Sequence, residues 1–349
     1  IHSEIYVDKT GLIAWTNRYL NTEQKYLCVS RPRRFGKSMA LRMLAAYYGS
    51  GRDSRELFAG RRIENDPSYE EYLNQYDVIL LNMQQFLIRA KDQDVTGCLE
   101  QSVIRDIRKT YGDLFSEQET ILAVVLEQIY AETGKKFIFL IDEWDCVMRE
   151  RQESEELQKQ YLDFLRNLLK DQPYVALAYM TGILPVKKYG QHSALNMFWE
   201  YSMTDQGFLE EYTGFTETEV QELCERYGMD FAEAGNWYDG YRFVEFRHIY
   251  NPKSVVEAML RHRFFNYWTT TETYDALKVY MDYDGLRQSI VQMLGGTPVR
   301  VNTLSFRNDM RNLASRDDVL TLLIHLGYLA YDQEREEAFI PNREIVREF

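Results

Sequence analysis

Apolar and polar residues are arranged in blocks along the first 207 positions, and these blocks predict the elements of the fold. Short apolar runs lack the period-two alternation of a half-exposed strand, which is typical of strands covered on both faces. Longer stretches between them have a helical pattern, and the charged run 149–160 is interpreted as a solvated helix face. Strands that alternate with helices predict a parallel α/β sheet. The predicted strands are residues 26–30, 78–83, 135–145 and 174–182, and the predicted helices are residues 38–48, about 95–132 with a break near 111–113, and 149–170.

The pattern changes after about residue 207, where the strand signal fades. Thr216 and Glu219 have the spacing of a capping box at the start of a helix. Residues 237–268 are rich in aromatic side chains, and residues 272–294 have a helical pattern again. Residues 317–342 predict a helix, a turn, a strand, a turn and a strand, the order of a small winged-helix-like module. We therefore expect an α/β core over residues 1–207, a helical region over 208–298 and a winged-helix-like segment over 299–349.

Gly36-Lys37-Ser38 stands between a predicted apolar strand and a predicted helix, the context that a phosphate-binding loop requires. Gly36 would let the backbone approach the phosphates, Lys37 would reach the β- and γ-phosphates, and the Ser38 hydroxyl would bind Mg²⁺. Amide groups at the helix start would face the anion. Arg31 replaces the usual leading glycine, so a basic surface turn without a ligand is the alternative. The predicted nucleotide-binding residues here are Arg31, Pro32, Arg33, Arg34, Phe35, Gly36, Lys37, Ser38 and Met39.

Acidic residues follow the predicted strand FIFLI, as a nucleotide hydrolase requires. Asp142 would hold Mg²⁺, directly or through water, together with Ser38. Glu143 would orient and deprotonate the attacking water. The alternative is a buried strand that happens to end in acids. Asp145 would either cap the next helix or contact a residue that binds the ligand.

The predicted strand YVALAYMTG ends in a polar residue that could take part in catalysis. Thr181 at its tip is predicted to contact the γ-phosphate or the attacking water. Lys187 and Lys188 follow it. A strand end followed by a solvated loop is the equally weighted alternative.

The composition is that of a globular chain with an acidic balance. The 349 residues carry a net charge of −13, so nucleic acid could be bound only through a local basic patch. Cysteines stand alone at 28, 98, 146 and 224, which favours buried thiols in a reducing cytoplasm over a zinc site. The sequence has no signal peptide and no run of 18 apolar residues, so no membrane span is predicted. The last nine residues, PNREIVREF, predict a helix that continues to the end of a chain cut from a longer protein.

Several of these stretches resemble a known family, the AAA-ATPase-like proteins of bacteria, a P-loop branch near the AAA+ and STAND ATPases. The resemblance covers nearly the whole chain, and RPRRFGKS is its most specific part because Arg31 is the family's own form. The matching stretches are YVDKTGLI (6–13), RPRRFGKS (31–38), LFAGRRI (57–63), FLIDEWD (139–145), TGILPVKK (181–188), WYDGY (237–241), YNPKSV (250–255), and the GYLAYD and IPN stretches near the end.

The resemblance implies an ASCE-type P-loop NTPase core, related to AAA+ proteins, with a helical lid and a winged-helix-like segment. It also implies ATP and Mg²⁺ as ligands, with Tyr6, Asp8 and Lys9 lying over the adenine; an N-terminal strap that packs on the core is the alternative. The aromatic segment 237–241 would be a lid element facing the nucleotide or, as we favour, a packing element. Asn251-Pro252 predicts a turn or a helix start.

The family domain is often fused to a C-terminal PD-(D/E)XK nuclease-like domain. No D…(D/E)-x-K constellation follows residue 300, so nuclease activity is not expected from this chain. The leading interpretation is a cytoplasmic ATPase that passes its nucleotide state to a fused nuclease-like domain or a separate effector, with Glu143, Lys37 and Thr181 as catalytic residues.

Two alternatives stay open: a nucleotide-binding switch with little turnover, and a nucleic-acid-binding module. Arg33, Arg34 and Arg242 are candidates for an arginine finger, which a neighbouring subunit of a homo-oligomer could also supply. Nucleic acid would be bound through a partner, because acids are interspersed among the C-terminal arginines, which are Arg300, Arg307, Arg311, Arg316, Arg343 and Arg347.

Overall fold

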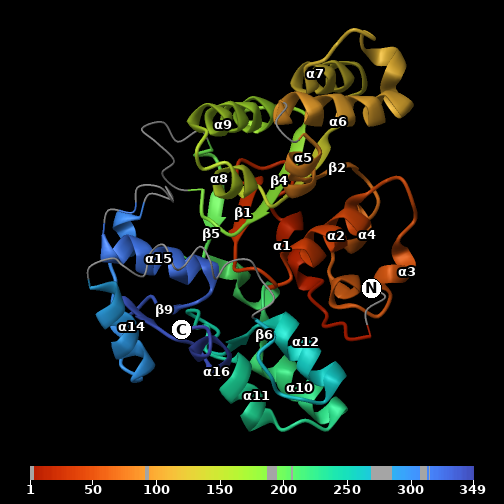
Figure 1. Cartoon of the computed structure of the whole chain (residues 1–349). Helices are drawn as coiled ribbons and strands as arrows, with labels where there is room; N and C mark the ends of the chain where they lie inside the picture. Colours follow the sequence, from red (N-terminus) through yellow and green to blue (C-terminus); the bar gives the residue numbers. More distant parts are fainter. Residues whose placement is uncertain are drawn as a thin grey trace.

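A parallel five-stranded sheet lies at the centre of the α/β half of the computed structural model (Figure 1). The structure describes residues 4–90, 94–186, 195–205, 207–268, 285–306, 313 and 315–349. All four strand pairs of the sheet are parallel, and the strand order is β2-β3-β4-β1-β5. The strands are β1 (Tyr26–Ser30), β2 (Asp77–Asn82), β3 (Phe137–Asp142), β4 (Val175–Gly182) and β5 (Trp199–Tyr201).

Both faces of this sheet are covered by helices, which explains the continuous apolar strands. On β3, Phe137, Phe139 and Ile141 pack into one cluster, whereas Ile138 and Leu140 pack into a cluster on the opposite face. The first cluster contains residues of α5 (Met83–Ala90), α6 (Val95–Tyr111), α7 (Leu122–Thr133), α8 (Cys146–Glu150) and α9 (Glu155–Leu169). The second contains residues of α1 (Gly11–Asn17), α2 (Lys37–Tyr48), α3 (Arg55–Phe58) and α4 (Tyr69–Tyr72).

The second half of the chain is mostly helical and has two small antiparallel sheets. Its helices include α10 (Glu217–Tyr227), α11 (Phe231–Tyr238), α12 (Pro252–Arg261), α14 (Leu286–Leu294), α15 (Arg316–Leu326) and α16 (Arg343–Val346). One sheet pairs β6 (Phe215–Thr216) with β7 (Ile249–Tyr250). The other has the order β8-β10-β9, from β8 (Val299–Arg300), β9 (Ala330–Asp332) and β10 (Glu337–Phe339). Short 3-10 helices lie at Arg62–Asn65 (η1), Gly112–Leu114 (η2), Gly207–Tyr212 (η3) and Thr303–Ser305 (η4).

The sequence predictions for the α/β class and for the four core strands are confirmed. The capping box at Thr216 and Glu219 is present, and Asn251 caps α12 with Pro252 in its first turn. The aromatic segment packs, as favoured: Trp237, Tyr238 and Tyr241 are buried.

Three expectations need correction or stay open. Residues 149–160 are not one helix face, because α8 ends at Glu150 and α9 begins at Glu155. A helix continuing through PNREIVREF is wrong, since α16 ends at Val346. The helix, turn, strand, turn, strand order of the last segment is present, while its winged-helix nature and the boundaries at 207 and 298 stay predictions. Lys187, Lys188, Arg307, Arg311 and most of the expected helix 272–294 lie outside the described residues.

Candidate functional site

Residues 31–38, which we call the GKS loop, join the end of β1 to the start of α2. Gly36 is the N-cap residue of α2 and has a φ of 86°, in the left-handed region that favours glycine. An added Cβ there would meet no atom within 4 Å, so the need for glycine is one of backbone conformation. Arg34 also has a positive φ, of 72°. The loop therefore turns sharply before the helix begins.

The ammonium group of Lys37 lies against the backbone of this loop. Its Nζ donates hydrogen bonds to the carbonyl oxygens of Arg31, at 2.8 Å, and Pro32, at 2.7 Å. The side chain is only 5% exposed, and burial lowers the pKa of the ammonium to about 8. The nearby carboxylates of Glu143, Asp145 and Asp142 oppose that shift. Lys37 is thus a buried cation that faces a cluster of acids.

Asp142 and Thr181 meet at the carboxyl ends of neighbouring strands. The Thr181 hydroxyl donates a 2.6 Å hydrogen bond to Oδ1 of Asp142, and both residues are buried. Thr181 also pairs in register with Val29 of β1, one residue before the end of that strand. The sheet therefore places Thr181 between Asp142 and the GKS loop.

Glu143 follows directly after β3 and has a φ of 56°. Its carboxylate forms an ion pair with Arg149 of α8. Arg149 also binds Asp145, with a distance of 3.1 Å between Nε and Oδ2. Asp145 occupies the N-cap position of α8 without a side-chain cap bond. Instead, its Oδ2 accepts hydrogen bonds from the amides of Ile183 and Leu184. Asp145 therefore connects the end of β4 to Arg149, which in turn contacts Glu143.

The sequence analysis missed Arg149, because it lies in the charged run that was interpreted as a solvated face. Its side chain is only 8% exposed. The sequence does contain one indication of this contact. Arg149 follows Asp145 by four residues, a sequence separation that brings two side chains together on a helix.

The side chain of Arg31 is bonded within the protein, and its contact with a nucleotide stays a prediction. It is fully buried and bonds the Thr213 hydroxyl and the carbonyl oxygens of Ser30 and Tyr201. Its guanidinium lies 5.0 Å from the centre of the Phe243 ring. Burial lowers the pKa of Arg31 to about 10.

The remaining loop residues divide into buried and accessible ones. Phe35 is buried, with its ring 5.0 Å from that of Tyr241 in an edge-on arrangement, and Pro32 is buried too. Met39 is 52% exposed. Arg33, Arg34 and Ser38 are half-buried.

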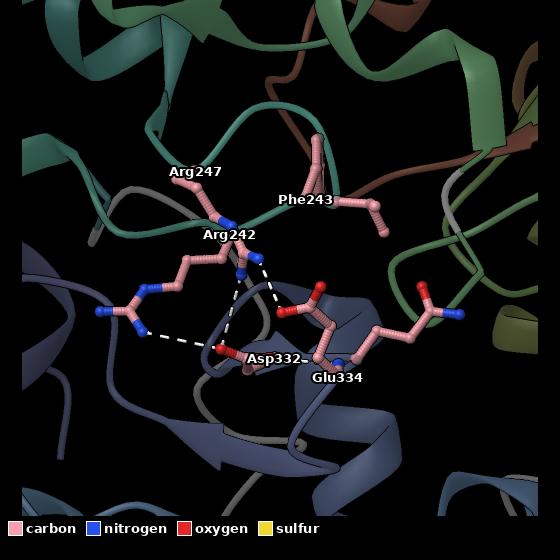
Figure 2. A pocket seen from close by; sticks show the side chains of 7 residues that line it. Arg242, Phe243, Arg247, Asp332 and Glu334 are labelled. Carbon is pink, nitrogen blue, oxygen red and sulfur yellow. Dashed lines mark hydrogen bonds and ion pairs between the residues drawn. The ribbon is translucent and has the colours of Figure 1, made fainter.

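Two of the arginine-finger candidates are engaged elsewhere. Arg34 donates a 2.6 Å hydrogen bond to the carbonyl oxygen of Tyr267. Figure 2 shows Arg242 and Arg247 converging on Asp332, each with a 3.8 Å ion pair. The cavity between them has a volume of about 10 Å³, too small for a nucleotide.

The N-terminal stretch makes the contacts of a strap. Lys9 Nζ forms a 2.6 Å ion pair with Glu219 and also bonds the Glu211 carbonyl oxygen. Asp8 accepts hydrogen bonds from the amides of Thr10 and Arg62. The ring of Tyr6 lies under the Arg61 guanidinium. Contact of these residues with adenine stays a prediction.

The cysteines of this chain are free. Cys28, Cys146 and Cys224 are buried, Cys98 is half-buried, and all four are free thiols. Among the residues that the structure describes, no group of three or more His, Cys, Asp or Glu could hold a metal ion. None of the described helices has the length and apolar character needed to cross a membrane.

Comparison with known proteins identifies relatives of this chain. A family model described as predicted AAA-ATPase matches residues 2–191, more than half of the chain. An uncharacterized protein in the vnfD 5′ region of Azotobacter chroococcum mcd 1 is 28% identical over 283 residues, which cover 77% of this chain and 51% of that protein. The chain thus spans about half the length of that relative.

Solved structures show only distant similarity. The Walker-type ATPase PABY2304 of Pyrococcus abyssi has a TM-score of 0.47 at 12% identity, with 97% of this chain and 94% of that chain covered. The ORC2 protein of Aeropyrum pernix, in ADPNP–ADP complexes, has a TM-score of 0.37 at 11% identity, with 100% and 95% covered. The family match confirms the resemblance seen in the sequence, and the chain belongs to the predicted AAA-ATPase family.

Proposed function

We propose that the chain is a P-loop ATPase module that binds ATP with Mg²⁺ at the GKS loop and hydrolyses it. The observation that carries the proposal is the convergence of Lys37, Asp142 and Thr181 at the carboxyl ends of three adjacent parallel strands. In open α/β sheets, ligands bind outside these strand ends. Membership of the predicted AAA-ATPase family supports the same function.

The residues at this edge fit a magnesium-bound nucleotide. The Ser38 hydroxyl and the Asp142 carboxylate are oxygen ligands of the kind that Mg²⁺ prefers. The bound ion would neutralise charge that develops on the phosphates. The Lys37 ammonium lies against loop carbonyls and would add a phosphate oxygen to its partners. The first amides of α2 would donate to the same phosphates.

Each of the other site residues has one task in this proposal. Glu143 accepts a proton from the water whose oxygen attacks the γ-phosphorus, while the bond to the ADP oxygen breaks. Thr181 fixes the orientation of Asp142 through its 2.6 Å hydrogen bond. Tyr6, Asp8 and Lys9 form the strap that would border the adenine.

We further propose that the nucleotide state is passed to residues 299–349 and from there to an effector. Support comes from the GKS loop itself. Pro32 packs against Gly327, so closely that an added Cβ on Gly327 would lie 2.7 Å from the Pro32 ring. Phe35 packs on Tyr241, whose hydroxyl donates a 2.7 Å hydrogen bond to the Gly327 carbonyl oxygen. A fused nuclease-like domain or a separate effector is the proposed recipient. The four free cysteines support a cytoplasmic location.

Direct binding of nucleic acid by this chain is less well supported. Several C-terminal arginines are engaged within the protein. Arg316 pairs with Asp317 at 2.7 Å, and Arg343 pairs with Glu233 at 3.3 Å. The guanidinium of Arg347 lies 4.7 Å from the centre of the Trp237 ring. Any binding of nucleic acid is therefore assigned to a partner or to a homo-oligomer.

The test compares ATP binding and phosphate release for the wild type, Lys37→Ala and Glu143→Gln, with and without Mg²⁺. Lys37→Ala should lose ATP binding, because it removes the buried ammonium that lies against the loop carbonyls. Glu143→Gln should bind ATP and release at least about 100-fold less phosphate, the range expected for loss of a general base. Lys159→Ala, which changes an exposed lysine of α9, is the matched control and should behave as the wild type.

Other outcomes would separate the alternatives. ATP binding without turnover in the wild type would favour a nucleotide switch, or a site that needs an arginine from a neighbouring subunit. Unchanged ATP affinity in Lys37→Ala would remove the GKS loop from the proposal. Equal loss of binding and turnover in Glu143→Gln would assign Glu143 a structural role.

A further inference from the structure

Arg149 of α8 lies between two carboxylates beside the proposed hydrolytic site. One guanidinium nitrogen pairs with Oε2 of Glu143, and Nε lies 3.1 Å from Oδ2 of Asp145. A planar guanidinium can make both contacts at once, which a lysine ammonium cannot do with the same fixed geometry. Arg149 thus connects the proposed general base to a second acid.

That second acid is rigidly held. Asp145 is fully buried, and its Oδ2 accepts hydrogen bonds from the amides of Ile183, at 3.1 Å, and Leu184, at 2.9 Å. These amides follow directly after β4, the strand that carries Thr181. Arg149 is therefore anchored to the same strand end that orients Asp142.

Glu143 is the loosely held member of the group. Its side chain is 25% exposed, compared with 8% for Arg149 and 0% for Asp145. Among the hydrogen bonds and ion pairs of the described residues, the Glu143 carboxylate has one partner, Arg149. Asp142 and Asp145 lie one and two residues from Glu143 in the sequence. Because all three carboxylates are negative, their repulsion favours a Glu143 side chain that points toward solvent. Arg149 opposes this repulsion.

Glu143 and the anchor of Arg149 lie at the edge of the sheet that also carries the GKS loop. Glu143 directly follows β3, the GKS loop follows β1, and β4 lies between these two strands. The amides that bind Asp145 follow β4, so Arg149 holds Glu143 at this same edge.

We propose that Arg149 is a positioning residue, which holds the Glu143 carboxylate at the sheet edge that also carries the GKS loop, from an anchor on Asp145. This inference rests on the proposed ATPase function. It assigns a role in turnover and none in ATP affinity, because Arg149 acts through Glu143 and not through the nucleotide.

The test measures kcat, KM and ATP affinity for Arg149→Ala, Arg149→Lys, Glu143→Gln and the double variant Arg149→Ala/Glu143→Gln. Arg149→Ala should lower kcat by about 100-fold, the cost of a misplaced catalytic group, with ATP affinity within about threefold of the wild type. Arg149→Lys should recover part of the loss, because it keeps a cation beside Asp145. Arg149→Ala should cause no further loss in the Glu143→Gln background, since the two residues act as a unit. Arg166→Ala, at an exposed position of α9, is the control.

Removal of Arg149 leaves Asp145 as an unpaired buried charge, so the Arg149→Ala chain could fail to fold. Arg149→Ala/Asp145→Asn removes both charges and then carries the test, together with Arg149→Lys. A wild-type kcat in the Arg149 variants, with Glu143→Gln inactive, would overturn this inference and leave the proposed function intact. A kcat above the wild-type value in the Arg149 variants would also overturn it. Arg149 would then hold Glu143 in an unproductive position in the wild type. No turnover in the wild type would overturn the role of Arg149 in turnover and would favour a nucleotide switch.

Discussion

At the scale of single residues, this protein buries several charged side chains and gives each a set of polar partners. Arg31 has three hydrogen-bond acceptors, Lys37 has two, and Asp145 accepts from two amides and an arginine. An unpaired buried charge is costly, so such partners are required. Lys37 and Asp145 lie beside the site proposed for the nucleotide, whereas Glu344 lies in α16, outside that site.

Glu344 predicts a measurable dependence of stability on pH. Its carboxyl is buried, accepts hydrogen bonds from the Ser254 hydroxyl and the Tyr267 amide, and lies near Glu348. Burial raises the pKa of Glu344 from 4.5 to about 7. Below pH 4.5 the group is protonated in both the folded and unfolded chains; between pH 4.5 and 7 only the unfolded chain ionises. The stability from this group is therefore fully present below pH 4.5 and is lost as pH rises from 4.5 through 7, by on the order of 3 kcal/mol.

The variant Glu344→Gln isolates this effect. Its midpoint of urea unfolding should fall less than that of the wild type between pH 5 and pH 8, and should exceed the wild-type midpoint at pH 8. Glu153→Gln, an exposed glutamate, is the control and should follow the wild type. A wild-type pH profile in Glu344→Gln would mean that Glu344 ionises at its ordinary pKa.

At the scale of elements, the first turn of α10 links the N-terminal strap to the helical region. Glu219 Oε2 accepts from the Thr216 amide at 2.8 Å, which completes the capping box, and from Lys9 Nζ at 2.6 Å. Burial lowers the pKa of Lys9, and Glu219 partly offsets that shift. One carboxylate therefore caps a helix and neutralises a mostly buried cation.

This double role predicts unequal costs for two changes in the same turn. Thr216→Ala removes a cap bond and should reduce the free energy of unfolding by about 1 kcal/mol. Glu219→Ala also leaves Lys9 without its carboxylate and should cost roughly 2–3 kcal/mol, between the values for exposed and buried ion pairs. Glu217→Ala, which removes an exposed acid from the same turn, is the control in denaturant unfolding. Equal costs for Thr216→Ala and Glu219→Ala would show that the Lys9 pair contributes no net stability.

The elements that the sequence predicted correctly are those with one strong local signal. The strands β1, β3 and β4 are continuous apolar runs, and α10 has its capping box. Strand β5, with the sequence WEY, gave no such signal, because it is three residues long and its Trp199 is 50% exposed. Its position is fixed by pairing with β1, a contact between residues about 170 positions apart in the sequence.

The candidate site shows the same division. Lys37, Asp142, Glu143 and Thr181 could be named because each stands at the end of a predicted strand or in the loop that follows one. The burial of Arg31 depends on Thr213, Tyr201 and Phe243, which lie far from it in the sequence. No local pattern reports such long-range contacts.

At the scale of the whole molecule, the GKS loop joins β1 to α2 and also contacts Gly327 at the end of α15. Gly327 caps α15 with a φ of 87°, and an added Cβ would lie 2.7 Å from Pro32 and 2.9 Å from Trp268. Pro32 supplies one of the two carbonyl oxygens that bind Lys37. A substitution at Gly327 that displaces Pro32 should therefore also move the carbonyl oxygen that binds Lys37, although Gly327 is far from the sheet in the sequence.

Gly327→Ala should weaken ATP binding by at least about fivefold, the lower end of typical coupling between sites. Gly228→Ala is a closely matched control. Gly228 also caps a helix, α10, with a φ of 63°, but an added Cβ there would meet no atom within 4 Å. Both substitutions impose the same kind of backbone strain, about 1–2 kcal/mol, so thermal unfolding should report a cost for each. Only Gly327→Ala should change the affinity measured by ATP titration, because only its Cβ displaces Pro32. If both variants lose stability and both bind ATP as the wild type does, changes in residues 299–349 do not affect the GKS loop. The proposed route from nucleotide to effector is then wrong.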